Sequence, residues 1–450
     1  MAKFFVSNEA ELQAAFEAAN AGDFDLNKII FAEDSVIELT SGLEYTGTGD
    51  LILKGNGAEI VASDDFQTFE GVSETVDGKG VALITSRSGG NVKIKDLELD
   101  GNQGRSQHGF ELDVPGEADG VIATVFKNVE VEGFWDHGVH LDDQAGATGQ
   151  GGDTAGGKDD LTGANSDASL FVKIVGSEIS ENGIYEGISV SDSDGFRVDE
   201  GRFGDAFVVI KNSEFVGNGA DGFELDETGK GFAAADVFRS VFNDNGPFDL
   251  NDTDDGLDID EAGAGRLQVR VRQSEINGNF DEGLDLDEAG RGSIFLDVQD
   301  TVANFNGNAK LEGLATDPGG TGVKLSEEGQ GNIFADVINS QANGNDDYGF
   351  RFEQFDGGEI EAFFESVWAL DNRNDVPDEG GRNGIRLESF ATGDGEEPEV
   401  LNPVFAEFNT VVATGNGREG LRVDADVFTA QFDGENLFDF VDFSNTVVFG

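Results

Sequence analysis

The sequence predicts an all-β protein whose chain winds into a parallel β-helix, with three short strands per coil and a capping helix at its N-terminus. The first observation is a segment that occurs in three similar copies, GFELDETGKG, GLDIDEAGAG and GLDLDEAGRG. Each copy alternates apolar and polar residues before a turn, which is typical of a short strand with one buried face. The second is spacing: Gly256 and Gly283 are 27 residues apart, and so are Gly322 and Gly349. This spacing is too long for a hairpin and fits one full circuit of a solenoid.

One such coil, residues 266–292, contains three segments with strand character: LQVRVR, residues 273–276 and GLDLD. The segments NGN and EAGRG separate them, and we expect their asparagine and glycine residues to take left-handed backbone positions. Looser copies of the glycine-led strand occur as HGFELD, HGVHLD, EGISVS, TGVKLS, YGFRFE, NGIRLE and EGLRVD. We therefore predict an N-terminal cap with the first coils in residues 1–80 and a β-helix in residues 81–450.

Residues 4–23 are predicted to form a strand followed by the capping helix. Asn8 is a suitable N-cap with Glu11 three residues later, and Gly22 can end the helix. The open end of a solenoid exposes core residues and unpaired strand edges, so a helix here is expected to cover the first coil. Its apolar stripe consists of Leu12, Ala15, Phe16 and Ala19.

The chain is strongly acidic, with 91 Asp and Glu residues against 28 Lys and Arg residues and a net charge of −63. Such a surface repels nucleic acids and anionic membranes and attracts cations. The absence of cysteine excludes disulfides and thiolate metal sites. An apolar fraction of 38%, with 38 Phe residues, is sufficient for a core. We expect aromatic stacks along the interior, at Phe110, Phe223, Phe350 and Phe352.

No apolar run approaches the length of a membrane span, and the start MAKFFVSNEAE has too short an apolar core for a secretory signal peptide. The Gly-, Asp- and Asn-rich composition and the final segment FDGENLFDFVDFSNTVVFG resemble those of bacterial proteins exported by type I secretion. This resemblance implies an extracellular or cell-surface location, reached by a route independent of a signal peptide. The cytoplasm of a salt-adapted organism is the alternative.

The opening of the chain, with FVSNEAELQAAFEAANAGD, IIFAEDSVIEL and LILKGNGAEI, resembles the entry of pectin-lyase-like proteins. This resemblance implies a single right-handed parallel β-helix. Residues 92–143, with VKIKDLELDGN and NVEVEGFWDHGVHLDD, resemble the alginate C-5 epimerases and related β-helix polysaccharide lyases. The D-P-H-E signature of those epimerases is absent, and DHGVHLDD stands where it is expected. An epimerase interpretation therefore needs a substitute set of catalytic residues.

The three histidines of the chain, His108, His137 and His140, lie within 33 positions. His108 and His137 each precede a strand glycine, which predicts that they stack on adjacent coils about 4.8 Å apart. In HGVHLDD the apolar residues point inward, so His140 and Asp142 are predicted to point outward onto a solvent-exposed face.

The same solvent-exposed face is predicted to contain Glu111 and Asp113, one coil earlier. Imidazoles among carboxylates can form an acid/base site or a metal site. The alternative is that they are ordinary polar residues on a solvated ladder. The candidate catalytic residues are His137 and His140 as acid and base, Asp142 as the orienting group and Arg105 as the cation that neutralises an acidic substrate.

Pairs of acidic residues recur at the strand-to-turn junctions of the regular coils. Stacked at coil spacing, they predict columns of carboxylates that either bind Ca²⁺, a hard oxygen-seeking cation, or are solvated with Na⁺ and water. A separate Gly-rich insertion, residues 144–169, is predicted to leave the coil as a loop beside the histidines. The acidic pairs are Asp226 and Glu227, Asp260 and Glu261, Asp287 and Glu288, and Glu327 and Glu328.

The outward residue in the middle of each glycine-led strand changes from mostly acidic to basic along the chain. Three interpretations are open: the basic half binds an anionic polymer, pairs with neighbouring acids, or meets the acidic half of another copy. The pairing partners are Glu353, Glu388 and Asp424, two residues further along the same face. The stripe consists of Glu111, His140, Ser189, Glu224, Asp258, Asp285, Lys324, Arg351, Arg386 and Arg422.

Two functions from different classes follow. The first is an exported, acidic, calcium-associated β-solenoid that forms part of a surface or matrix and joins end to end with itself. The uniform coils and the missing catalytic signature favour it. The second is a lyase or epimerase acting on an acidic polysaccharide, which needs a base near the sugar carbon and a cation or proton donor for the uronate carboxylate. The acidic surface opposes the second function, because it repels a polyuronate unless calcium bridges the two. Neither nucleic acid binding nor membrane insertion is expected.

Overall fold

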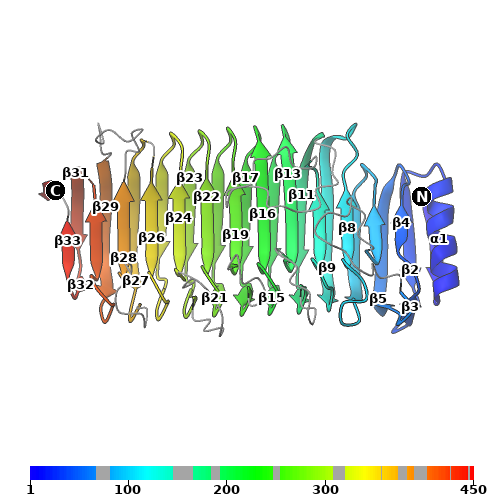
Figure 1. Cartoon of the computed structure of the whole chain (residues 1–450). Helices are drawn as coiled ribbons and strands as arrows, with labels where there is room; N and C mark the ends of the chain where they lie inside the picture. The colour runs from blue at the N-terminus through cyan, green and yellow to red at the C-terminus, as the bar shows by residue number, and fades with distance from the viewer. Residues whose placement is uncertain are drawn as a thin grey trace. The chain divides into compact units, whose positions relative to one another are not determined.

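The computed structural model describes residues 1–66, 82–144, 166–183, 193–246, 254–307, 320–355, 357–372, 383–389, 403–425, 427–443 and 446–449. The chain forms two compact units, Met1–Gly231 and Phe232–Gly450, each built from short strands that pair in parallel (Figure 1). The predicted all-β parallel β-helix is confirmed. Within the ranges given above, no helix is long and apolar enough to cross a membrane. The predicted division near residue 80 stays a prediction.

The N-terminal unit opens with one strand and one helix and continues with strands alone in its described part. Its elements are β1 (Ala2–Val6), α1 (Glu9–Ala21), β2 (Leu26–Phe31), β3 (Val36–Leu39), β4 (Leu43–Tyr45), β5 (Asp50–Ala62), β6 (Ile84–Ser86), β7 (Val92–Asp100), β8 (Phe110–Asp113), β9 (Asp119–Glu132), β10 (Val139–Asp142), β11 (Asp167–Val175), β12 (Glu178–Ser180), β13 (Phe196–Arg202), β14 (Ala206–Lys211), β15 (Glu214–Val216) and β16 (Phe223–Gly229).

The capping helix α1 forms as predicted. Oδ1 of Asn8 accepts a hydrogen bond from the backbone N–H of Glu11 at 3.1 Å, and the Glu11 carboxylate accepts one from the backbone N–H of Ser7 at 2.8 Å. These two hydrogen bonds satisfy backbone N–H groups at the start of the helix. The helix packs on β1 to β4, beside which Figure 1 shows it. Its buried stripe is the predicted one, Leu12, Ala15, Phe16 and Ala19.

The C-terminal unit consists of strands throughout its described part. They are β17 (Ala233–Phe238), β18 (Val241–Asn243), β19 (Leu257–Glu261), β20 (Leu267–Arg272), β21 (Glu275–Asn277), β22 (Leu284–Glu288), β23 (Ile294–Gln299), β24 (Val323–Glu327), β25 (Ile333–Ile338), β26 (Phe350–Gln354), β27 (Ile360–Trp368), β28 (Ile385–Ser389), β29 (Pro403–Ala413), β30 (Leu421–Asp424), β31 (Val427–Asp433), β32 (Leu437–Phe438), β33 (Val441–Phe443) and β34 (Thr446–Phe449).

The coil analysed in the sequence contains the three predicted strands, β20, β21 and β22, and in the next two coils the strand equivalent to β21 is reduced to isolated bridges at Val302 and Gln341. In the C-terminal unit β19, β20 and β21 make one coil and β22 begins the next, with Leu284 opposite Leu257 and Glu288 opposite Glu261. In the N-terminal unit the same relation places β10 on β8, β13 on β10 and β16 on β13. The glycine-led segments therefore lie above one another within each unit.

Left-handed residues and glycines serve two different purposes in the coil from Arg266. Gln273, with φ 54°, and Gly278, with φ 72°, turn the chain between strands, so the predicted role of NGN is confirmed for its glycine, whereas Asn277 and Asn279 do not take a positive φ. The prediction is wrong for EAGRG, because Gly290 does not take a positive φ. A Cβ at Gly290 would instead lie 1.6 Å from the backbone oxygen of Gly263 in the preceding coil. Glycine is required there because successive turns approach so closely.

Aromatic rings fill the interior of both units, as predicted. Phe196 and Phe223 stack with ring centroids 5.5 Å apart in the N-terminal unit, and Phe364 and Phe408 stack at 5.4 Å in the C-terminal unit. The four phenylalanines expected to point inward are all buried: Phe110, Phe223, Phe350 and Phe352.

A ladder of buried asparagines joins neighbouring coils. The side-chain amide of Asn279 donates to Oδ1 of Asn306 at 3.1 Å, and that of Asn306 donates to Oδ1 of Asn345 at 3.1 Å. The backbone N–H of each residue donates to the same oxygen as its side chain. The N-terminal unit repeats the pattern between Asn182 and Asn218. These bonds satisfy buried polar groups that would otherwise destabilise the interior.

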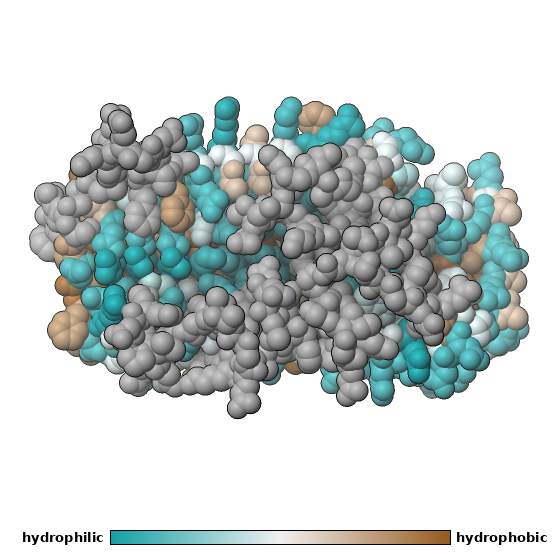
Figure 2. Space-filling model, in the orientation of Figure 1, coloured by the Kyte–Doolittle hydropathy of each residue, from teal (hydrophilic) through white to brown (hydrophobic). Residues whose placement is uncertain are grey.

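The surface agrees with the acidic composition. On the face drawn in Figure 2, hydrophilic side chains predominate among the described residues, and apolar ones are scattered between them. A net charge of −63 on such a surface keeps copies of the chain apart unless cations neutralise it.

Candidate functional site

The structure brings the three histidines together, as predicted. The rings of His108 and His137 stack with centroids 5.4 Å apart and planes inclined by 8°. The His140 ring lies 5.9 Å from that of His108 and 5.0 Å from that of His137. Strands β8 and β10 position them, because Val139 pairs with Phe110 and His140 pairs with Glu111.

The prediction that the histidines lie on a solvent-exposed face is wrong, because the side chains on this face are buried. The alternation holds, since Val139 and Leu141 lie in the core and neighbouring side chains point to the other face of β10. His140 and Asp142 on that other face are nevertheless 2% and 0% exposed, and all three histidines are buried. Glu111 and Asp113 are buried as well, and their partners include Thr85 Oγ1 for Glu111 and the Arg87 guanidinium for Asp113.

His140 is held as a cation by its neighbours. Its Nε2 lies 2.7 Å from Oδ2 of Asp199. Burial by itself lowers the pKa of His140, but the hydrogen bond and charge of Asp199, together with the charge of Asp142, raise it to about 9. The ring is therefore protonated at neutral pH and cannot accept a proton from a substrate.

His108 is held neutral in the same cluster. Burial, opposed only partly by Asp136, lowers its pKa to about 3. Its Nε2 lies 3.9 Å from Oδ2 of Asp136, and its Nδ1 has no hydrogen-bond partner among the residues whose positions are given. Gln107 donates a hydrogen bond of 2.8 Å to the same Asp136 oxygen. His108 thus contributes an uncharged ring to the stack.

Both nitrogens of His137 face groups of the protein. The backbone N–H of Asp194 donates to Nδ1 at 3.0 Å, and Nε2 lies 3.6 Å from Oδ1 of Asp136. The Asp194 carboxylate also lies 3.3 Å from Nδ1, so this nitrogen faces both a backbone donor and a carboxylate. Protein groups therefore face the His137 ring at both of its nitrogens.

Arg197 is the centre of this network, and sequence reasoning did not identify it. It lies in β13 opposite His140 and is completely buried. Its guanidinium contacts Asp199 at 3.2 Å, Asp194 at 3.3 Å and Asp226 at 2.8 Å. It also contacts Glu224 at 2.5 Å. One buried cation therefore neutralises part of a cluster of carboxylates contributed by β13, β16 and the turn before β13.

The structure keeps Asp142 beside His140 and places Arg105 away from the histidines. Arg105 is exposed, and within the described residues no contact joins it to the histidines. Asp142 is buried, and its Oδ1 accepts the backbone N–H of Gln144 at 2.7 Å. The buried cation of the cluster is Arg197 instead of Arg105.

The predicted acidic pairs are divided by the pleat of their strands. In β22, Glu288 shares the core face with Leu284 and Leu286, whereas Asp287 lies on the opposite face with Asp285. Of the two alternatives for the columns, solvation with Na⁺ and water does not fit the six residues named as metal ligands, because all six are buried. They are Asp226, Glu227, Asp260, Glu261, Asp287 and Glu288.

The stripe of charged residues is paired within the C-terminal unit, as one of the three interpretations predicted. Arg351 contacts Glu353 at 2.6 Å, Arg386 contacts Glu388 at 2.5 Å and Arg422 contacts Asp424 at 2.7 Å. Lys324 pairs with Asp285 of the preceding coil at 2.6 Å. These cations already have carboxylate partners, which argues against an anionic polymer on this face. Ser189 and residues 145–165 of the Gly-rich insertion lie outside the described residues.

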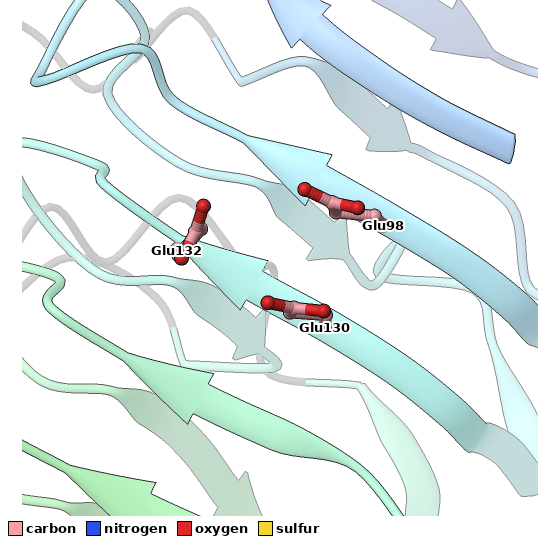
Figure 3. Close-up of side chains that lie close together, drawn as sticks. All are labelled: Glu98, Glu130 and Glu132. Atoms are coloured by element: carbon pink, nitrogen blue, oxygen red, sulfur yellow. The ribbon is translucent and has the colours of Figure 1, made fainter. Parts of the chain in front are cut away.

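A half-exposed cluster of glutamates in the N-terminal unit was missed. Glu98 on β7 lies beside Glu130 on β9, and Glu132 follows two residues later on the same side (Figure 3). Oxygens of all three lie within 4.8 Å of one another. Burial, followed by the charges of Glu59 and Glu130, raises the pKa of Glu98 to about 7. The signal in the sequence was the acidic alternation of LELD and VEVE on adjacent coils.

This glutamate cluster has the chemistry of a cation site. Register extends it into a column of side chains one coil apart, and carboxylate oxygens at this spacing suit a hard cation such as Ca²⁺. The column consists of Glu59, Glu98, Glu130, Glu178 and Glu214.

Comparison with known proteins finds similarity to solved structures alone. No protein-family model and no curated protein matches the chain. A periplasmic alginate epimerase matches with a TM-score of 0.42 and 11% identity, over 96% of this chain and 83% of that one. The A-module of a mannuronan C-5 epimerase from Azotobacter vinelandii gives 0.38 and 14%, over 98% and 92%, and a pectate lyase gives 0.35 and 12%, over 95% and 72%. At these TM-scores the likeness is distant and assigns no function.

Proposed function

We propose that the protein is a non-catalytic, acidic β-solenoid that serves as a structural component of a cell surface or matrix and assembles end to end in the presence of calcium. The observation that carries this proposal is the burial of the candidate catalytic residues His137, His140 and Asp142. His140 is bonded to Asp199, and both nitrogens of His137 face protein groups. Arg197, which a uronate would need as a counter-charge, is already surrounded by carboxylates.

Calcium is part of the proposal because the chain carries a large negative charge that a cation can neutralise. Copies of a chain with a net charge of −63 repel one another, and a divalent cation bound at the column around Glu98, Glu130 and Glu132 lowers that repulsion. The contact between copies is assigned to apolar residues of β33 and its neighbours in the C-terminal unit. Leu437, Phe440 and Val441 are 58%, 70% and 44% exposed. Export by a route independent of a signal peptide belongs to the same proposal.

Calcium is expected to drive reversible assembly of the purified chain. Addition of about 1 mM calcium, the affinity range of extracellular calcium modules, should produce oligomers or fibres that dissolve in EDTA. Sedimentation velocity and electron microscopy measure the effect. The triple variant with Glu98, Glu130 and Glu132 changed to Gln should lose the response. The control triple variant with Glu17, Glu33 and Glu38, all exposed, changed to Gln should keep it.

A second experiment separates the contact surface from the cation site. Phe440→Asp is expected to bind calcium as the wild type does but to remain monomeric, because it places a charge in the exposed apolar contact. Isothermal titration with calcium and sedimentation of the same sample report the two properties. A wild-type chain that stays monomeric at all calcium concentrations contradicts the assembly proposal.

The alternative function is a lyase or epimerase acting on an acidic polysaccharide. The observation in its favour is the cluster of three imidazoles beside Asp136, Asp194 and Asp199. We expect neither unsaturated uronic products from alginate or pectate by ultraviolet absorbance nor epimerised residues by proton NMR. Turnover by the wild type that is lost in His137→Ala would replace the structural proposal with the enzymatic one.

A further inference from the structure

A row of acidic side chains on the core face of the C-terminal unit is not used by the function proposed above. Glu261 of β19, Glu288 of β22 and Glu327 of β24 occupy equivalent positions at the ends of adjacent strands, and Gln354 of β26 continues the row. All four side chains are completely buried. We call these four residues the glutamate ladder.

One oxygen of each ladder residue has the same role. Oε1 of Glu261 accepts the backbone N–H groups of Gly263 and Gly265, both at 3.0 Å. Oε1 of Glu327 accepts those of Gly329 and Gly331 at 3.0 Å. Glu288 accepts the N–H of Gly292 at 2.7 Å, and Gln354 accepts that of Gly358 at 3.0 Å. The turn after each strand is thus closed by the side chain at its start.

The second terminal atom of each ladder residue faces the adjacent coil. Nε2 of Gln354 donates a hydrogen bond to Oε2 of Glu327. Oε2 of Glu288 is buried, and within the described part of the chain no N–H or hydroxyl group donates to it. By register, the carboxyl groups of Glu261 and Glu327 lie next to the Glu288 side chain, one in the preceding coil and one in the following coil. Two buried carboxylates at this separation cannot both be ionised without a large penalty, whereas one shared proton gives a strong hydrogen bond.

Among the residues that the structure describes in the C-terminal unit, no cation is placed to neutralise the ladder. The neighbouring strands carry Asp260, Asp287 and Glu353 near it, and by the pleat these point to the opposite face. The adjoining turns carry Arg266, Arg291, Glu328 and Glu359, of which the first three are exposed and the last is half-buried. The principal influences on Glu288 and Glu327 are burial, the other ladder side chains and glycine amides.

We propose that the glutamate ladder is a proton-binding array, in which neighbouring carboxyl groups share protons in the way that the Gln354 amide donates to Glu327. Gln354 carries the argument, because an amide N–H occupies the place that the O–H of a protonated glutamate would take, and an NH₂ group cannot ligate a metal ion. The ladder is therefore a pH-sensitive connection between coils. This inference does not depend on the proposed function.

The sign of the pH dependence follows from the direction of the shifts. Burial, followed by the neighbouring ladder carboxyl, raises the pKa of both Glu288 and Glu327 from the ordinary value of 4.5 to about 7. Between these two values the folded chain keeps protons that the unfolded chain releases. The stability that the ladder contributes is therefore complete below about pH 4.5 and is lost as the pH rises to about 7.

The test compares thermal unfolding of the full-length chain between about pH 5 and pH 8, the range that brackets the shifted pKa values. Glu288→Gln supplies a permanent donor, so its melting temperature should fall less than that of the wild type over this range. Gln354→Glu adds a carboxyl group, so its melting temperature should match the wild type at the acidic end and lie below it at the alkaline end. Glu328→Gln, an exposed neighbour of the ladder, should retain the wild-type slope.

Infrared spectroscopy provides a reading that does not depend on stability. The wild type at neutral pH should show an absorption of protonated carboxylic acid that is reduced in Glu288→Gln and unchanged in Glu328→Gln. The proposal is overturned if Glu288→Gln lowers the melting temperature equally at all pH values, or if the carboxylic acid band is absent. It is also overturned if the effect of the substitution disappears in EDTA, because the ladder then holds a cation instead of protons.

Discussion

Replacement of Arg197 by methionine is expected to destabilise the N-terminal unit by about 3–5 kcal/mol at neutral pH. Methionine fills similar space but leaves Asp194, Asp199, Glu224 and Asp226 buried around a lost cation. Removing one partner of a buried ion pair is far more harmful than never building the pair, because the remaining charges keep their desolvation penalty. Urea unfolding measures the loss, and hydrogen exchange in β10, β13 and β16 locates it.

Arg202 provides the matched control for Arg197. It lies in the same strand, but its side chain is 49% exposed and its contact with Asp167 is 3.3 Å long. Arg202→Met is therefore expected to change the free energy of unfolding by about 1 kcal/mol or less, as for other surface ion pairs. Equal losses in the two variants would show that the buried network is not special.

The deficit of Arg197→Met should also shrink in acid. In the wild type, burial opposes ionisation of Asp194, yet His137 and Arg197 hold its pKa below the ordinary value of 3.8. A depressed pKa adds stability that is present above about pH 3.8 and disappears as the pH falls below it. Without the guanidinium this contribution is smaller, so the two unfolding curves should converge as the pH falls. A gap that is independent of pH would mean that Arg197 acts through packing instead of charge.

Most of the fold could be predicted because successive coils share both their length and their alternation of apolar and polar residues. The alternation in GLDLDEAGRG predicts a strand and its two faces, and the 27-residue spacing predicts the stacking. The strand missed by this reasoning is β13. EGISVS and DGFRVD alternate equally well, and only the period distinguishes them, since Gly195 precedes Gly222 by 27 residues. Without β13, the position of Arg197 in the stripe was assigned to Ser189.

The candidate site was predictable in composition but not in environment. Alternation indicates which side chains share a face, so the meeting of His108, His137 and His140 followed from the sequence. Whether other parts of the chain cover that face is a tertiary property that no local pattern records. The burial of Asp142 and Glu288 was therefore missed, and with it the shift in pKa that decides which groups can take up protons.

The close approach of successive glycine-rich turns leads to the second large effect on stability. Gly290→Ala is expected to cost about 3 kcal/mol, at the upper end of the range for overpacking. The added Cβ would lie 1.6 Å from the oxygen of Gly263, a backbone atom that cannot move independently of its coil. The next residue, Arg291, donates its backbone N–H to that same oxygen at 3.2 Å, so the substitution separates a hydrogen-bonded turn.

Gly89→Ala separates this steric effect from the general consequences of losing a glycine. A Cβ at Gly89 would meet only Ala118 Cβ at 3.7 Å and Pro115 Cγ at 3.8 Å, and the residue does not take a positive φ. Its substitution should leave stability unchanged or raise it by up to about 1 kcal/mol through a less flexible unfolded chain. Thermal and urea unfolding of the two variants decide the matter. If Gly290→Ala unfolds like Gly89→Ala, the glycine-rich turns tolerate wider spacing, and the fixed distance between coils must come from the asparagine ladder and the strands alone.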